Sequence, residues 1–271
     1  NFAGLSGGGA YIYLAGSVDI LNSRFLGNTS SEAGGGLYLL DTGAALIDQS
    51  LFDGNIASSG GGGAAILTDA AIEDSTFQNN VVTTVAFAFD EGGGGISIAQ
   101  DFGFQPTVTV LRSTISNNRA PLGGGIGSAN ANLTITDSTI VGNQATNSFG
   151  GGGGIGFAQD DTMGVEPRVT LTVVSSLIQN NLSAADAAGI GIADADASII
   201  RTNVLSNIAS GRGGGIGIIG SSNSPTLSIE QSTVAFNGAT SDGGGIAAVD
   251  AGLRALNITV SNNTSDGFGG G

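Results

Sequence analysis

The chain has 271 residues, among them 49 Gly, and its 22 acidic side chains outnumber 7 basic ones, which gives a formal charge of −15. It contains no His, Cys, Trp or Lys, which excludes ordinary zinc sites, Cys nucleophiles, Ser-His-Asp triads and Lys-dependent phosphate loops. The acidic balance opposes nucleic-acid binding, and no apolar run is long enough for membrane insertion by this segment.

A repeat runs through the whole chain. Three residues, nearly always Gly-Gly-Gly, precede a small or aliphatic residue about every 29 residues. The triplets begin at Gly7, Gly34, Gly61, Gly93, Gly123, Gly152, Gly213, Gly243 and Gly269, and a degenerate copy is Ala187-Ala188-Gly189. A fixed period of this length predicts a solenoid, because one repeat cannot bury its apolar face but stacked repeats can.

A second mark follows the same period: an aliphatic residue or Phe, two further residues, then Asn. Asn tolerates left-handed turns, and its amide can bond the repeats above and below. We therefore expect a structural Asn ladder. Its predicted members are Asn28, Asn55, Asn80, Asn118, Asn143, Asn180, Asn207, Asn237 and Asn263.

The segments between the marks have β character. Residues 133–136, 169–172 and 227–229 alternate apolar and polar side chains and are rich in β-branched residues. About three short strands fit in each repeat, so the sequence predicts an all-β fold, a parallel β-helix of about nine coils and roughly 43 Å at ~4.8 Å per strand. We expect the rings of Phe25, Phe52 and Phe77 to stack inside it, and the Gly triplets to form tight corners.

Both ends of the chain fall within a repeat. Asn1 precedes the first Gly triplet by six residues, the spacing of several ladder positions, and the last residues are a further triplet. The sequence thus predicts a single β-helix domain over 1–271, uncapped at both ends. Such a domain is a segment of a longer rod or a subunit that joins further copies of itself head to tail in a filament.

Acidic residues recur shortly after the Gly triplets, at Asp41, Asp69, Asp101, Asp160, Asp194 and Asp250. Stacked carboxylates suit Ca²⁺, and Asp160, Asp161, Asp194 and Asp196 are the candidate ligands. The alternative is that each Asp bonds its own backbone in an Asx-turn, and no cofactor is then required. Asp74, Arg112 and Asp137 occupy equivalent positions in successive repeats, which predicts a lateral charge ladder.

The pairing of Gly-Gly-Gly-Ile with aliphatic-x-x-Asn resembles the repeats of polymorphic outer membrane proteins. It is also similar to the Ser-Thr-Ile-x-x-Asn coils of repetitive bacterial surface proteins. The resemblance covers the whole chain and implies a right-handed parallel β-helix, export to the cell surface, and an adhesive role. The chain differs from the first family in having mostly Gly at the third triplet position, where that family has Ala.

These features predict a structural or adhesive extracellular rod without enzymatic activity, whose partners are further copies of itself and surface glycans. One alternative is a carbohydrate-active β-helix, a polysaccharide lyase or hydrolase, that uses the four candidate Asp residues with Arg168 and Arg201. Another is a glycan-binding module that uses the loop at 159–168.

Overall fold

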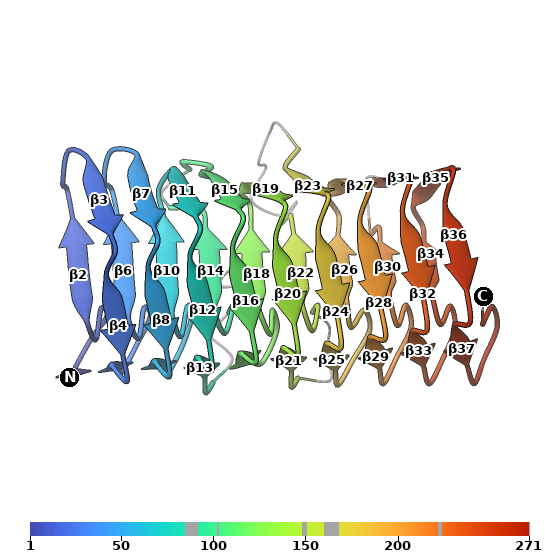
Figure 1. Cartoon of the computed structure of the whole chain (residues 1–271), viewed down its shortest axis with the longest axis horizontal. Helices are drawn as coiled ribbons and strands as arrows, with labels where there is room; N and C mark the ends of the chain where they lie inside the picture. Colours follow the sequence, from blue (N-terminus) through green and yellow to red (C-terminus); the bar gives the residue numbers. More distant parts are fainter. Residues whose placement is uncertain (85–91, 102, 148–150, 160–167, 222–223, 271) are drawn as a thin grey trace.

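The chain forms a parallel β-solenoid of about nine coils, in which four parallel sheets run the length of a rod and the two termini lie at opposite ends (Figure 1). The computed structural model describes residues 1–84, 92–101, 103–147, 151–159, 168–221 and 224–270. Each coil crosses the four sheets in turn, and every strand between the two ends of a sheet pairs with its counterparts one coil before and one coil after it. The predicted fold is confirmed.

Sheets A to D are defined by their strands. Sheet A holds β1 (Phe2–Ala3), β5 (Thr29–Ser30), β9 (Ile56–Ala57), β13 (Val81–Val82), β17 (Arg119–Ala120), β21 (Gln144–Ala145), β25 (Leu182–Ser183), β29 (Ile208–Ala209), β33 (Gly238–Ala239) and β37 (Thr264–Ser265). Sheet B holds β2 (Ala10–Tyr13), β6 (Leu37–Leu40), β10 (Ala64–Leu67), β14 (Ile96–Ala99), β18 (Ile126–Ala129), β22 (Ile155–Ala158), β26 (Ile190–Ala193), β30 (Ile216–Ile219) and β34 (Ile246–Val249). Sheet C holds β3 (Val18–Leu21), β7 (Ala45–Asp48), β11 (Ala70–Glu73), β15 (Thr107–Leu111), β19 (Asn132–Thr136), β23 (Thr170–Val174), β27 (Asp196–Ile200), β31 (Thr226–Glu230) and β35 (Gly252–Leu256). Sheet D holds β4 (Arg24–Leu26), β8 (Leu51–Asp53), β12 (Thr76–Gln78), β16 (Thr114–Ser116), β20 (Thr139–Val141), β24 (Leu177–Gln179), β28 (Asn203–Leu205), β32 (Thr233–Ala235) and β36 (Thr259–Ser261).

Each coil therefore carries four strands where three were predicted. The additional strand belongs to sheet A and is two residues long, as in Thr29–Ser30. Two residues are too short to show an alternating pattern in sequence. In the structure they are defined as a strand by parallel pairing with the neighbouring coils, for example Thr29 with Ile56.

Apolar side chains at alternating strand positions fill the inside of the rod. One continuous core extends from Val18 to Val234, and its larger members in the middle coils are fully buried. The rings of Phe25, Phe52 and Phe77 stack along the axis, with centroids 4.5 and 4.4 Å apart and nearly parallel planes. The predicted aromatic stack is confirmed, and it places the coils in one register.

The Gly triplets form the corner that enters sheet B. Gly34 has φ +66°, and a methyl group on Gly35 would lie 2.5 Å from the carbonyl oxygen of Gly62 in the next coil. Real Cβ atoms do not approach a backbone oxygen so closely, so the stacked corners require Gly. The prediction of tight corners is confirmed.

Inward side chains of the terminal coils are more exposed than their counterparts inside the rod. Phe52 is fully buried, whereas Phe25 in the first coil is half-buried. Every residue of β35 in the last coil is exposed.

No helix among the described residues is long and apolar enough to cross a membrane.

Candidate functional site

A row of Asn side chains runs along the rod where sheet D turns into sheet A. Asn55 shows the geometry: its Nδ2 donates to Asn80 Oδ1 and to the carbonyl oxygen of Phe25, both at 2.9 Å. The backbone N–H of Asn55 also donates to Asn80 Oδ1, at 2.9 Å. Its own Oδ1 accepts two hydrogen bonds from Asn28, both at 3.0 Å. Each buried amide is thereby satisfied by the adjacent coils, as burial of a polar group requires.

The predicted ladder is wrong at one position. Asn181 is fully buried and accepts from Asn143 Nδ2, whereas Asn180 has φ +55° and forms the exposed turn before it. The sequence allowed both registers, because Leu177 and Ile178 are both apolar and Asn180 and Asn181 are adjacent. Parallel pairing of Ile178 with the inward residue of the previous coil selects Asn181. The row consists of Asn1, Asn28, Asn55, Asn80, Asn118, Asn143, Asn181, Asn207, Asn237 and Asn263.

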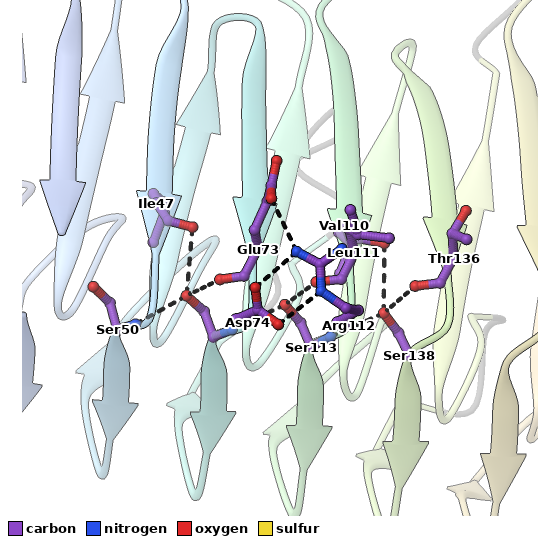
Figure 2. Close-up of polar contacts among 11 residues, drawn as sticks. Ile47, Ser50, Glu73, Asp74, Val110, Leu111, Arg112, Ser113, Thr136 and Ser138 are labelled. Carbon is purple, nitrogen blue, oxygen red and sulfur yellow. Dashed lines mark hydrogen bonds and ion pairs between the residues drawn. The ribbon is translucent and has the colours of Figure 1, made fainter. Parts of the chain in front are cut away.

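A second polar row, which the sequence analysis did not identify, runs where sheet C turns into sheet D. The N–H of Ser50 donates to Ser75 Oγ, and the N–H of Ser75 donates to Ser113 Oγ, at 3.0 and 3.1 Å. Ser113 continues the row to Ser138, and all four of these hydroxyls are buried (Figure 2). The available signal was a Ser or Thr two residues before the apolar residue of the Asn motif, often in the pair Ser-Thr. The row runs through Ser23, Ser50, Ser75, Ser113, Ser138, Ser176, Thr202 and Ser232.

Charged side chains next to this row form a lateral ion pair. Arg112 lies over the preceding coil, with its guanidinium 2.7 Å from Asp74 Oδ2 and 3.2 Å from Glu73 Oε2 (Figure 2). The hydrogen bond from Arg112 holds the pKa of Asp74 below its ordinary value. Within the described part of the chain Arg112 pairs with these two carboxylates and not with Asp137, so the predicted ladder extends over one coil step only. The pair is exposed, and pairs of this kind contribute little to stability.

The four candidate Ca²⁺ ligands are divided by the structure. Asp160 and Asp161 lie outside the described residues. Asp194 has φ +55° and accepts from the N–H and hydroxyl of Ser221, at 2.6 and 2.8 Å. Asp196 accepts from the N–H and hydroxyl of Thr226, at 2.8 and 3.0 Å, and from Arg168 at 3.1 Å.

Asp194 and Asp196 therefore bond to the segment between sheets B and C of the following coil, where Ser221 follows β30 and Thr226 begins β31. Burial raises the pKa of Asp196, but the hydrogen bonds from Thr226 and Arg168 outweigh burial and leave this pKa below its ordinary value. Among the residues that the structure describes, no three His, Cys, Asp or Glu side chains group closely enough to hold a metal ion. Ca²⁺ binding at the four candidates stays a prediction.

Asp69 acts like Asp194, because its Oδ1 accepts from the N–H of Thr107 one coil later, at 2.7 Å. These two carboxylates bond across coils, where the Asx-turn alternative expected bonds to their own backbone. Asp101 is different: burial, with a smaller contribution from Asp41, raises its pKa. Within the described residues its Oδ2 is buried without a hydrogen-bond partner.

Comparison of the chain with family models, with curated proteins and with solved structures finds no match.

Proposed function

We propose that this β-helix is a structural and adhesive segment of an extracellular rod, stacked end to end on further coils and displayed at a cell surface. One observation carries the proposal: the Asn and Ser rows extend through successive coils and hold them in one register. Their buried polar groups bond to neighbouring coils, an arrangement suited to stiffness along the axis. The resemblance of the repeats to those of bacterial surface proteins supports the extracellular location.

The two end faces of the rod carry complementary hydrogen-bonding groups. Along the Asn row each residue donates to the Oδ1 of the next, as Asn237 donates to Asn263, so the row presents donors at one end and acceptors at the other. Apolar side chains at inward positions accompany them: Ala248 lies in register with the buried Ile218 and is exposed. A further coil, of the same polypeptide or of a second copy, satisfies both kinds of group.

End-to-end stacking of a second copy is limited by one overlap between strands. Sheet A has ten strands, whereas sheets B, C and D have nine each. Direct stacking of two copies places β1 of one where β37 of the other already lies. One of these two-residue strands must leave the sheet, and its few hydrogen bonds make that a small cost.

Small-angle X-ray scattering and negative-stain electron microscopy test the proposal, each with and without millimolar Ca²⁺. A stiff segment gives the scattering of a thin rod, and end stacking gives filaments that lengthen with concentration. Ala248→Arg places a charge on an end face and should abolish the filaments. Leu256→Arg is the matched control, because Leu256 is an outward residue of the same coil that is also exposed. Compact particles would contradict the rod, and separate rods at every concentration would contradict stacking between copies.

A further inference from the structure

The outer face of sheet C is open to solvent along the rod. Its outward side chains are exposed or half-buried in every strand from β3 to β35. Charged residues lie toward the two ends of this face, and the outward residues of β15, β19 and β23 between them are uncharged. The charged residues are Asp19, Asp48 and Glu73 at one end and Asp196, Glu230 and Arg254 at the other.

A row of hydroxyl groups crosses the middle of this face, and we call it the Thr row. Its members lie in register on successive strands and are Thr109, Thr134, Thr172, Ser198 and Ser228. Ser228 accepts a hydrogen bond from Arg254 at 3.5 Å, whereas the hydroxyls of the other four have no hydrogen-bond partner among the described residues. These four hydroxyls are therefore free to bond to water or to a ligand.

The rows on either side of the Thr row differ from each other. One is mostly aliphatic and presents the methyl groups of Leu111, Val174 and Ile200. In the other row, polar side chains bond to one another between coils, as where Asn132 Oδ1 accepts from the hydroxyl of Thr170 at 3.2 Å. The face thus combines free hydroxyls with methyl groups.

The spacing of these groups is regular in two directions. Neighbouring coils are ~4.8 Å apart, and successive outward residues of one strand are ~6.6 Å apart, at ~3.3 Å per residue. The buried Asn and Ser rows hold the coils in register, and the strands of sheet C follow one another along a straight rod (Figure 1). Branching at Cβ restricts χ1 of each Thr. The Thr row and its neighbours therefore form a rigid two-dimensional array.

We propose that this face binds the surface of ice. Oxygen atoms on the prism planes of ordinary ice repeat at two distances close to those of the array. Each hydroxyl of the Thr row can donate and accept a hydrogen bond, as a water molecule of the lattice does. The hydroxyls then occupy lattice positions, and the methyl groups beside them lose exposed apolar surface on contact, which is favourable.

The charge and the side-chain types of the face favour ice over other ligands. Ionised groups are costly to remove from liquid water, and the outward residues of β15, β19 and β23 include none. A glycan site commonly stacks sugar rings on aromatic side chains, and no outward residue of the sheet C strands is aromatic.

The area of the array sets the expected strength of binding. Five strands at ~4.8 Å and five residues at ~3.3 Å cover about 400 Å². We therefore expect adsorption to ice and slower recrystallisation of ice rather than a large depression of the freezing point. The proposal extends the adhesive role to a definite surface but requires only a folded rod, so it and end-to-end stacking can fail separately.

Slow growth of ice on a cold probe in a dilute solution of the Ala248→Arg chain tests the proposal, because bound protein enters the ice and other solutes are excluded. We expect this chain to be enriched in the ice and the added pair Thr134→Arg/Thr172→Arg to abolish the enrichment. Gln144→Arg/Leu182→Arg is the matched control, because it adds the same charge at exposed positions of sheet A in the same two coils. Circular dichroism in the cold verifies that each variant is folded.

The orientation of the bound protein gives a second measurement. The chain has no Lys, so an amine-reactive dye labels its α-amino group alone. A lattice match predicts that the labelled chain stains discrete planes of a single ice crystal, whereas random trapping stains the crystal evenly. Exclusion of the parent chain from ice, even staining, or equal enrichment of the Thr variant and its control would each overturn the proposal. Retention on an uncharged polysaccharide without enrichment in ice would assign the face to glycans instead.

Discussion

Replacement of one residue in the Asn row tests whether this row stabilises the rod. Asn118 is almost fully buried in the middle of the row. Its Oδ1 accepts from the N–H and the Nδ2 of Asn80, at 2.9 and 3.0 Å, and its Nδ2 donates to the carbonyl oxygen of Phe77 at 2.9 Å. Asn118→Ala removes the partner of these three buried groups.

The size of the effect follows from those groups. Each buried donor or acceptor left without a partner costs about 1–3 kcal/mol. With the other Nδ2 hydrogen of Asn80 still bonded to Phe52, we expect Asn118→Ala to lower the free energy of unfolding by about 3–6 kcal/mol. That is a large part of the ~5–15 kcal/mol of an ordinary domain.

Equilibrium urea unfolding followed by far-UV circular dichroism measures the loss. Amide hydrogen exchange gives a local reading, because the N–H of Asn80 loses its acceptor and should exchange faster. Asn117→Gly is the control, since Asn117 is exposed, has φ +54°, and Gly accepts that conformation. A loss below ~1 kcal/mol for Asn118→Ala, or equal losses in both variants, would refute the role assigned to the row.

Three further changes test the packing and the charges. Phe52→Ala removes the middle ring of the aromatic stack and should cost about 3–5 kcal/mol in thermal or urea unfolding, whereas a loss under ~1 kcal/mol would contradict its core role. Gly124→Ala puts a methyl group 2.2 Å from a backbone oxygen of the next coil and should prevent cooperative folding, whereas Gly16→Ala meets nothing within 4 Å and should fold normally; similar melting curves for both would refute the corner argument. The pKa of Asp74 is lowered by Arg112, so their pairing adds stability above the unfolded-state pKa of the carboxyl and loses it as the pH falls through the folded-state pKa. Urea titrations of the wild type and Arg112→Gln should therefore show a small gap at neutral pH that closes in acid and in high salt, and a gap independent of pH would count against the pair.

Local sequence patterns were sufficient to predict the Asn row at nearly every position. The prediction was wrong at Asn180 because two adjacent Asn residues follow two adjacent apolar residues, and a local pattern does not show how one coil is aligned with the next. The pairing of β24 with β20 fixes that alignment. The Ser row was not predicted for a related reason. Ser is common in turns, and only the stacked coils show that each hydroxyl accepts a hydrogen bond from an N–H of the preceding coil.

The carboxylates show the same division. Asp194 and Asp196 are close in sequence, and their carboxylates were therefore predicted to bind one Ca²⁺ ion together. In the structure each bonds the backbone of the following coil, about thirty residues later, because the turn and the strand place their oxygens beside those amides.

The sequence by itself determined the solenoid, its period and its inner columns, because each repeat carries the same local marks of Gly corner, alternating strand and Asn turn. Only the tertiary structure decided the fourth strand of each coil and the hydrogen-bond partners of the polar rows. These features depend on the fit between neighbouring coils. Residues that are neighbours along the rod are some thirty positions apart in the chain, a distance over which local patterns carry no information.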